Sequence, residues 1–280
     1  VWRLPLPGGI PLQLVEIPAW EGWIGSPDEE EGRTAYGYRP ECEGKDVESL
    51  RRVALPAFGM ARTPISQAQW RAVAELEPVG RDIPVDPATE KGAELPVETV
   101  SWNDAQEWCA RLNLVLRNEL GEQAPQVALP SESQWEVACR AGTTTPFHFG
   151  DTIDAGWANH DGTYTYGAGH QGTYLNRPSP VGAYGLVNRW GLADLHGNVW
   201  EWCADLWHPS AEGAPGDGSA WLEPDAELKG DAATYRLLRG GSWLNDPVYC
   251  RSACRNGGHP GLRDNTFGFR VCCLPPGFPP

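Results

Sequence analysis

The sequence has no apolar run long enough to cross a membrane, and it has few positive charges. Its apolar stretches stay below the roughly 18 residues that a spanning helix needs, so we expect no membrane insertion. It also lacks the charged and then apolar segments of a secretory signal, which favours a cytoplasmic location and is compatible with a further segment upstream of Val1. Only 22 Lys and Arg stand against 37 Asp and Glu, and the net charge of −15 argues against nucleic acid as a partner.

Methionine occurs once, and the eight cysteines are spread over 280 residues. Cys272 and Cys273 are adjacent, a spacing at which two cysteines rarely pair, so we expect buried free thiols rather than a disulfide framework. By contrast, 14 Trp, 33 Gly and 26 Pro indicate a chain rich in turns and held by large aromatic anchors. We expect a single domain over residues 1–280, and a monomer.

Alternating and capping patterns predict an α+β fold with short elements. Strands are predicted over 10–17, 20–26 and 52–61, the first two joined by a turn. Helices are predicted over 67–76, 104–113 and 131–140, and their N-caps are Ser66, either Ser101 or Asn103, and Ser131. The segments between them, 27–47, 77–95 and 208–235, are predicted to be loops.

The last forty residues differ from the rest in having ordered ends and an irregular middle. The ends, 239–243 and 268–273, bracket a stretch rich in Gly, Asn, Asp and Pro without a helical or strand period. Apolar side chains such as Leu244, Tyr249 and Leu262 occur where a solvated loop is normally polar. A strand-like frame that holds a long irregular segment is typical of recognition surfaces, so we predict a binding face, with a plain loop as the alternative.

A second informative stretch combines carboxylates with a turn. Asp194, Glu201 and Asp205 flank the turn at 196–198, and carboxylates near turn carbonyls suit a hard cation such as calcium. This spacing alone equally fits carboxylates that are only solvated or hydrogen-bonded. The apolar part of the stretch is predicted to pack into the core through Val199, Trp200, Trp202 and Trp207.

Seven motifs appear in a fixed order: Trp23-Ile-Gly-Ser26, Pro64-Ile-Ser-Gln-Ala-Gln-Trp70, Pro96-Val-Glu-Thr-Val-Ser-Trp-Asn-Asp-Ala105, Leu129-Pro-Ser-Glu-Ser-Gln-Trp-Glu136, Gly197-Asn-Val-Trp-Glu-Trp202, Arg239-Gly-Gly-Ser-Trp243 and Gly268-Phe-Arg270. The series resembles the formylglycine-generating enzyme, or sulfatase-modifying factor, family over almost the whole chain. This resemblance implies an elaborated C-type-lectin fold with much irregular structure. It also implies a calcium site with side-chain oxygens from Asp194 and Glu201 and backbone carbonyls from Gly197 and Val199.

The resemblance does not extend to the copper-binding cysteines of the family's enzymes. Alignment places Pro247 and Ser252 at those two positions, and neither can act as a thiolate ligand. Cys250 and Cys254 are present in a different register. The six histidines form no nucleophile–base motif, and the additional His-bearing domain of the related ergothioneine sulfoxide synthases is not found in this sequence. We therefore predict no enzyme activity and no copper site.

A second group with this fold, the variable proteins of diversity-generating retroelements, resembles the C-terminal segment more fully. In that group, a template rich in Asn codons is copied with its adenines randomised. By this resemblance the framing residues are Arg239, Gly240, Gly241, Ser242, Trp243, Pro247, Cys250, Arg251, Arg255, Pro260, Arg263, Gly268, Phe269 and Arg270. The interspersed, variable positions are Leu244, Asn245, Asp246, Val248, Tyr249, Cys254, Asn256, Gly257, Gly258, His259, Gly261, Leu262, Asp264, Asn265, Thr266 and Phe267.

The residues at these sixteen positions agree with that origin. An AAC codon with both adenines randomised cannot encode Lys, Glu, Gln, Met or Trp, and none of these occurs there. Chance would give this result in roughly one chain in twenty. We predict that the sixteen positions are largely exposed and clustered, that Trp243, Phe269 and Val271 enter the core, and that four framing arginines hydrogen-bond loop backbone: Arg251, Arg255, Arg263 and Arg270.

The predicted function is therefore that of a ligand-binding, receptor-like protein. Its partner would be a protein or another macromolecule, since a randomised surface does not reveal its ligand. Two alternatives remain: an oxygen-dependent modifying enzyme of the formylglycine-generating type, and a catalytically silent accessory domain of a larger protein.

Overall fold

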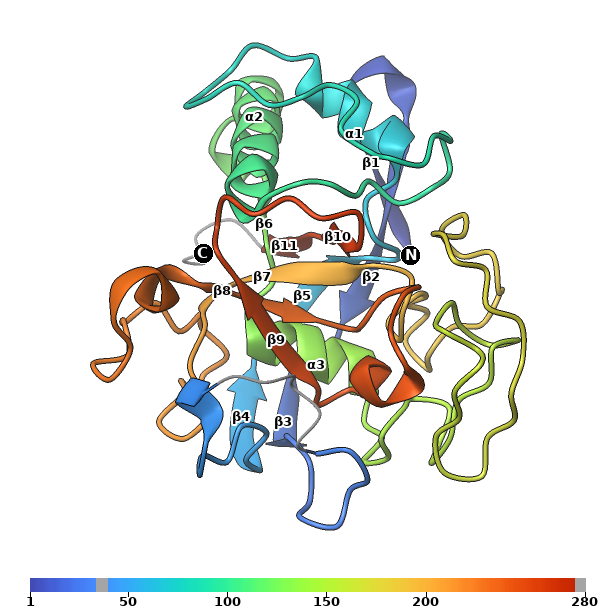
Figure 1. The fold of residues 1–280 in the computed structure, drawn as a ribbon. Coiled ribbons are helices and arrows are strands. Elements are labelled where there is room, and N and C mark those ends of the chain that lie inside the picture. The colour runs from blue at the N-terminus through green and yellow to red at the C-terminus, as the bar shows by residue number, and fades with distance from the viewer. Residues whose placement is uncertain (34–39, 275–280) are drawn as a thin grey trace.

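The strands form three sheets in residues 1–33 and 40–274, the part of the chain that the computed structural model describes (Figure 1). The largest sheet is antiparallel, in the order β1 (Trp2–Pro5), β2 (Pro11–Ile17), β5 (Phe58–Ala61), β11 (Cys272–Leu274) and β6 (Gln126–Ala128). The second sheet has the order β10 (Phe267–Gly268), β7 (Trp200–Leu206), β8 (Arg236–Arg239) and β9 (Arg255–Gly258), with β10 parallel to β7. The third pairs β3 (Trp20–Ile24) with β4 (Arg51–Leu55).

Helices lie against these sheets, which makes the fold α+β as predicted. The helices of the described chain are α1 (Gln67–Ala74), α2 (Trp102–Leu120) and α3 (Glu132–Arg140). Each begins with a capping box, in which the side chain of Ser66, Ser101 or Ser131 accepts a hydrogen bond from the backbone three residues on. Such a cap stabilises a helix by about 1 kcal/mol, and all three predicted cap positions are confirmed, with Ser101 rather than Asn103.

Three element boundaries differ from the prediction. The strand predicted over 52–61 is two strands in different sheets, because the chain turns at Pro56, which has no N–H to donate to a ladder. The strands predicted over 10–17 and 20–26 exist but do not pair with each other, since β2 pairs with β1 and β5 and β3 pairs with β4. Helix α2 continues past Asn113 to Leu120 and ends at Gly121, whose φ of 65° lies in the left-handed region.

Tryptophan and phenylalanine rings fill the core, and the C-terminal segment supplies one of them. Phe269 lies edge-on to Trp70 of α1 and Trp108 of α2, with ring centroids 6.0 and 5.6 Å apart. All three rings are fully buried. The predicted anchors Val199, Trp200, Trp202 and Trp207 are also buried. The end of the chain therefore holds the helices together as well as forming surface.

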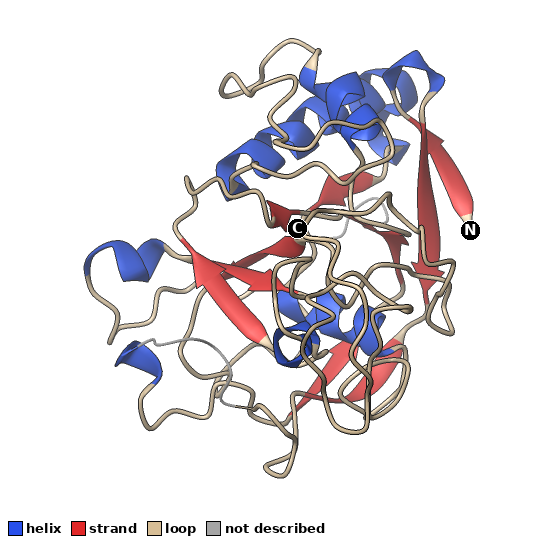
Figure 2. Cartoon of the chain, turned by 45° about the vertical axis from the view of Figure 1, so that its right-hand side comes forward, coloured by secondary structure: helices blue, strands red, loops and turns tan. Residues whose placement is uncertain are grey.

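Long irregular segments surround these elements, and loops make up most of the chain in Figure 2. The loop predicted over 27–47 is not simply exposed, because Glu30, Cys42 and Val47 are buried; its residues 34–39 lie outside the described residues. All eight cysteines lie in the described ranges, where they are buried thiols outside any disulfide, as predicted. Within those ranges, no helix combines the length and apolar character that crossing a bilayer requires.

Candidate functional site: a framed C-terminal face

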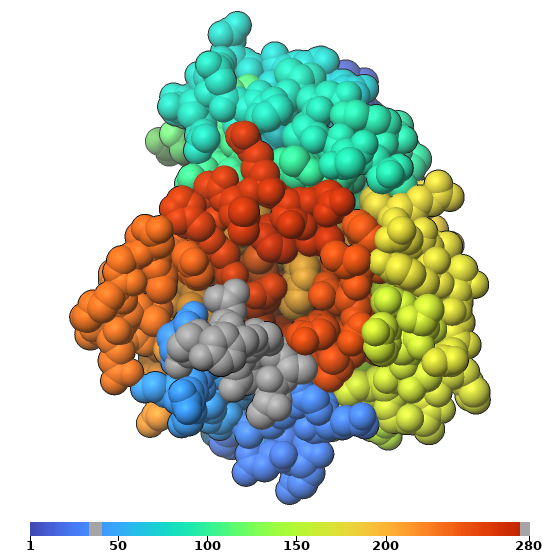
Figure 3. All heavy atoms as spheres, in the orientation of Figure 1, coloured from blue at the N-terminus to red at the C-terminus, as the bar shows by residue number. Residues whose placement is uncertain are grey.

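The segment Arg239–Cys273 covers one face of the molecule while its ends belong to both larger sheets. It leaves β8, makes a 3₁₀ turn at Pro247–Cys250, forms the edge strand β9 and returns through β10 to β11. Figure 3 shows it in orange and red around a hollow in the centre of this face, bordered by segments from earlier in the chain. We call the exposed and half-buried residues between Leu244 and Asn265 the display face.

Arg251 fixes the middle of the segment to the loop that follows β3. Its guanidinium donates to both oxygens of Glu48, at 2.8 and 2.7 Å, and to Glu30 at 2.6 Å. It also donates to the carbonyls of Gly32, at 2.7 Å, and Val248, at 3.0 Å. Burial lowers the pKa of Arg251, but its hydrogen bonds and charge interaction with Glu48 more than offset this and raise it. Arg251 is therefore a permanent cation buried under the display face.

Helix α3 holds two more framing arginines through carboxylates one turn apart. Arg255 donates to both oxygens of Glu132, at 2.6 and 3.0 Å, and Arg239 donates to Glu136. Burial alone would raise the pKa of Glu132, but the charges of Arg255 and Arg239 lower it to about 2. Both arginines also donate to backbone carbonyls. Arg255 donates to the carbonyl of His208, and Arg239 donates to that of Ser252. Glu132 and Glu136 were not predicted as partners of the arginines, although their spacing places both on one face of α3.

The other two framing arginines differ from each other. Arg270 is fully buried and donates to the carbonyls of Ala61, Ala193 and Asp194 as well as to Glu201. Arg263 pairs with the carboxylate of Asp104 at the start of α2, at 2.7 Å, and its side chain is 40% exposed. The predicted backbone anchoring is thus confirmed for Arg251, Arg255 and Arg270. For Arg263 the prediction is wrong, because the residue binds a carboxylate instead.

Eleven of the sixteen interspersed positions are exposed or half-buried, so the predicted surface exists in large part. The exposed ones are Leu244, His259, Gly261, Leu262 and Asn265, and the half-buried ones are Asn245, Asp246, Val248, Tyr249, Asn256 and Asp264. The prediction of exposure is wrong for the remaining five, which are buried: Cys254, Gly257, Gly258, Thr266 and Phe267.

Close packing against tryptophans explains three of these corrections. A Cβ on Gly257 would lie 2.9 Å from the ring of Trp207, and one on Gly258 would lie 3.1 Å from Trp202. Phe267 stacks edge-on against Trp202, with ring centroids 5.4 Å apart. Cys254 belongs to the same apolar core, and Thr266 hydrogen-bonds to Asp264. These positions support the frame rather than the surface.

One half-buried position also has a structural task. The side-chain oxygen of Asn245 accepts hydrogen bonds from the indole N–H of Trp200, at 2.8 Å, and from the hydroxyl of Ser242, at 2.6 Å. A side chain without an acceptor would leave the N–H of Trp200 without this partner, at a cost of about 1–3 kcal/mol. Position 245 therefore tolerates change less than its exposure indicates.

The positions that align with the copper ligands lie inside the protein. Pro247 opens the 3₁₀ turn, and the buried Ser252 hydroxyl accepts from the thiol of Cys139 at 3.6 Å. Burial raises the pKa of Cys254 to about 12 and also raises that of Cys250, so both are thiols at neutral pH. Neither sulfur is available as a thiolate to take the place of the missing ligands.

Two of the four predicted calcium ligands, Asp194 and Glu201, contact the guanidinium of Arg270, the former through its backbone carbonyl. Each carboxylate oxygen of Glu201 accepts from Arg270, at 2.6 and 2.8 Å, and one also accepts from Trp135 at 2.7 Å. The carboxylate of Asp194 accepts from the backbone N–H of Gly182 at 2.6 Å, so one of its oxygens is engaged. Glu201 thus has a cation from the protein itself.

Backbone conformation at this turn is unusual. Asp194, Gly197 and Asn198 all have positive φ, and a Cβ on Gly197 would lie 2.2 Å from the carbonyl oxygen of Asn159. Asp194 and Asn198 carry side chains, and positive φ at such residues is a backbone strain that is often found at ligand sites. No cluster of three or more His, Cys, Asp or Glu side chains fit for a metal occurs in the described ranges. The predicted site has only two carboxylates and otherwise uses backbone carbonyls, so the absence of such a cluster does not test it. Calcium at Asp194, Gly197, Val199 and Glu201 stays a prediction.

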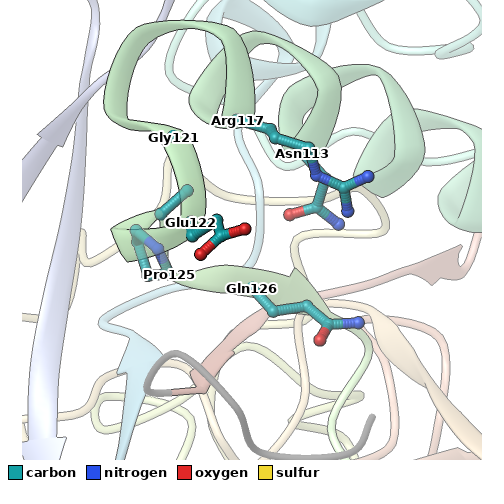
Figure 4. Close-up of a pocket in the computed structure, with 7 residues that line it drawn as sticks. Asn113, Arg117, Gly121, Glu122, Pro125 and Gln126 are labelled. Atoms are coloured by element: carbon teal, nitrogen blue, oxygen red, sulfur yellow. The ribbon is translucent and has the colours of Figure 1, made fainter.

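A surface pocket of about 450 Å³ lies apart from the display face, at the end of α2. Figure 4 shows Asn113 and Arg117 of α2 beside Glu122 and Gln126. The amide of Asn113 donates to the carbonyl of Val127, at 2.7 Å, and accepts from its N–H, at 2.8 Å. It therefore closes the free edge of β6 against further pairing, which is a structural role.

These features define an elaborated C-type-lectin fold whose C-terminal segment combines a buried frame with an exposed surface. The chain belongs to the family of the sulfatase-modifying factor enzyme 1-like domain, whose model matches residues 29–273. Among solved structures, PvdO from Pseudomonas aeruginosa is 30% identical, with a TM-score of 0.71 over 93% of this chain and 94% of that one. Variable protein 1 of Treponema denticola is 23% identical, with a TM-score of 0.64 over 98% and 99%, which shows the fold alone.

The relatives in sequence include enzymes and a protein named as inactive. The formylglycine-generating enzyme of Mycobacterium tuberculosis is 27% identical over 276 residues, 81% of this chain and 90% of that protein. The mouse inactive C-alpha-formylglycine-generating enzyme 2 is 30% identical over 214 residues, 74% of this chain and 55% of that protein. The chain spans between 20% and 55% of the length of three of its curated relatives.

Proposed function

We propose that this chain is a ligand-binding protein that displays a retroelement-diversified surface on a C-type-lectin scaffold. The separation of frame and surface within one segment carries this proposal. Arg239, Arg251, Arg255 and Arg270 are buried and bonded to carboxylates and carbonyls, whereas eleven residues between them face solvent or are half-buried. A fold whose stability rests on the frame can carry many different surfaces.

Two further observations support the proposal. The exposed positions contain none of the five amino acids that an adenine-randomised AAC codon cannot encode. The Treponema protein that shares the fold is named a variable protein. Leu244 and Leu262 are 50% and 45% exposed on the display face, and exposed aliphatic side chains of this kind favour a protein as the partner.

The same proposal has consequences for compartment and assembly. Eight buried thiols outside any disulfide suit a reducing compartment, which favours the cytoplasm. We expect the protein to act as a monomer, with calcium at the Asp194 turn as a structural cofactor.

An enzyme of the formylglycine-generating type is the second candidate, and it rests on the relatives that carry that name. Pro247 and the buried Ser252 stand against it, because neither can bind copper as a thiolate. A silent accessory domain of a longer protein is the third, and the short coverage of several relatives is compatible with it.

Comparison of the gene among independent isolates tests the proposal. We expect substitutions confined to the first two bases of codons for the display face, each matching an adenine in a nearby near-identical repeat, and a reverse transcriptase gene close by. Identical segments in all isolates and no such repeat would contradict diversification. Conversion of a sulfatase peptide by the purified protein, or stoichiometric tight binding of copper(I), would support the enzyme instead.

A further inference from the structure

A small pocket lies between the start of β2, the first turn of α1 and the loop at Val181. Its volume is about 190 Å³, whereas most ligand pockets measure roughly 300–1,000 Å³, so it suits a small molecule. Apolar and polar residues both line it, and we call Ile10, Leu12 and Val181 its apolar wall. No residue of 239–273 lines this pocket, which is therefore separate from the display face.

One positively charged residue, Arg62, lines the pocket. Its backbone is held on both sides, since its N–H donates to the carbonyl of Gln13 at 2.9 Å and its carbonyl accepts from the N–H of Ala193 at 2.8 Å. The guanidinium reaches the loop that forms the pocket's edge, because a Cβ on Gly182 would lie 3.7 Å from its Nη1. A rigid backbone therefore positions this side chain at the pocket.

The guanidinium of Arg62 has no acceptor from the protein. The residue is half-buried, yet within residues 1–33 and 40–274 its side chain forms neither an ion pair nor a hydrogen bond. Arg111 and Arg251, which are also withdrawn from solvent, each bind a carboxylate at 2.8 and 2.6 Å. Since a partly desolvated cation without an acceptor is unfavourable, the pocket favours an anion.

The carboxylates near the pocket restrict the charge of that anion. An oxygen of Asp194 accepts from the N–H of Gly182 at 2.6 Å. Burial raises the pKa of Asp194, and its bond to Gly182 and the charge of Arg62 offset this only in part. Glu94 lines the pocket and is exposed. With one cation, an acid at the rim and a net charge of −15, a singly charged anion is favoured over a doubly charged one.

Two uncharged side chains add hydrogen-bonding capacity. Gln13 and Thr63 are half-buried and line the pocket, and neither side chain has a hydrogen-bond partner in the described residues. The amide of Gln69, by contrast, is already bonded to two backbone groups. An amide and a hydroxyl can each donate to a carboxylate oxygen, and the flat fork of an arginine matches a carboxylate.

We propose that this pocket binds a small monocarboxylic acid. Arg62 holds the carboxylate together with Thr63 and Gln13, and the short hydrocarbon end of the acid packs against the apolar wall. The inference is separate from the proposed function, because none of the sixteen interspersed positions lines the pocket. Every variant of the display face would therefore carry the same site.

The probe is butyrate, with butyramide as its neutral match in shape, at constant ionic strength. Titration is followed by NMR at the Nε–H of Arg62 and at the backbone N–H of Thr63 and Val181. We expect saturable shifts with butyrate and binding at least about tenfold weaker, or none, with butyramide. Arg62→Met should weaken butyrate binding by about tenfold or more, and Glu94→Gln should strengthen it by removing a like charge.

Arg71→Met is the matched control, because Arg71 is an exposed arginine of α1 that pairs with Asp86 and does not line the pocket. This variant should bind butyrate as the parent protein does. The guanidinium of Arg62 bonds to nothing in the protein, so Arg62→Met should leave the melting temperature without butyrate unchanged. Thr63→Val, which keeps the charge, should weaken binding by about threefold or more.

Four results would overturn the proposal. Two are equal responses to butyrate and butyramide, and unchanged butyrate binding in Arg62→Met with an intact dispersed spectrum. A third is a lower melting temperature of Arg62→Met without butyrate together with full binding in Thr63→Val, which would make Arg62 a structural residue. The fourth is binding of phosphate or of trialanine as tight as that of butyrate, which would indicate a general anion or the C-terminus of a polypeptide instead.

Discussion

Arg251 and Glu48 form a two-pronged ion pair, at 2.8 and 2.7 Å, in which both side chains are completely buried. Arg251 belongs to the C-terminal segment and Glu48 to a loop near the other end of the chain. Since a buried charge without its partner is strongly destabilising, the pair makes the segment and the scaffold one cooperative unit.

The first prediction concerns this pair. Arg251→Met should lower the free energy of unfolding by about 3–5 kcal/mol, because Glu48 and Glu30 remain buried without their cation. Urea denaturation followed by tryptophan fluorescence measures the loss. Arg52→Ala, which breaks an exposed pair with Glu21, should cost about 0–1 kcal/mol. Equal effects of the two substitutions would mean that the buried pair does not hold the segment.

The second prediction concerns the display face. Replacement of Leu244, Val248, Tyr249, His259 and Leu262 together by Ser or Asn should leave the fold intact, since surface changes cost about 0.5 kcal/mol or less each. Val248 and Tyr249 are half-buried and should account for most of the loss. Trp243→Ala, in the frame, should cost about 3–5 kcal/mol. If the fivefold variant unfolds while Trp243→Ala survives, frame and surface are assigned the wrong way round.

A third prediction separates two glycines among the interspersed positions. Gly257→Ala should destabilise the protein by about 1–3 kcal/mol, because its Cβ would meet the buried ring of Trp207 at 2.9 Å. Gly261→Ala, in an exposed part of the segment, meets only the side chain of His259 and should change the melting temperature little. A thermal melt of each variant checks this. If Gly257→Ala leaves the melting temperature unchanged, position 257 can vary without loss of stability, as first predicted.

Sequence patterns predicted the frame of this face better than its surface. The framing arginines and Phe269 came from the resemblance to the variable proteins of diversity-generating retroelements. Gly257 and Gly258 are buried against Trp207 and against Trp202 of β7, and Cys254 lies in the apolar core; no local pattern reveals these contacts. The partners Glu30, Glu48, Glu132 and Glu136 were missed for a similar reason, since their arginines lie more than 100 residues away.

The fourth prediction concerns pH. Burial and then the charge of Glu132 raise the pKa of Asp205 to about 7. The folded protein therefore holds this proton more tightly than the unfolded chain does, and stability falls as pH rises from about 4 to 7. Asp205→Asn should remove this loss, so its urea midpoint should fall less between pH 5 and pH 8 than that of the parent. Asp231→Asn, an exposed acid, should leave the parent's slope unchanged.

The fifth prediction concerns calcium. If Asp194, Gly197, Val199 and Glu201 bind the ion, a chelator should lower the melting temperature and added calcium should restore it. Asp194→Asn should abolish this sensitivity. It is a better variant than Glu201→Ala, which would also orphan Arg270 and the indole of Trp135. An unchanged melting temperature with chelator, in protein that metal analysis shows to contain calcium, would argue against a stabilising site.

The sequence distance between Arg251 and Glu48, 203 residues, has a consequence for how each copy of the protein matures. During synthesis the earlier part of a chain emerges first, so Glu30, Glu48, Glu132 and Glu136 are made before the arginines of the C-terminal segment that pair with them. A copy in which this segment does not pack keeps Glu30, Glu48 and Glu132 without their arginines, leaves Glu136 with Arg140 alone, and has a core without Phe269. Such a copy stays open to proteases, so under the proposed diversification folding itself would remove defective variants before any ligand binds.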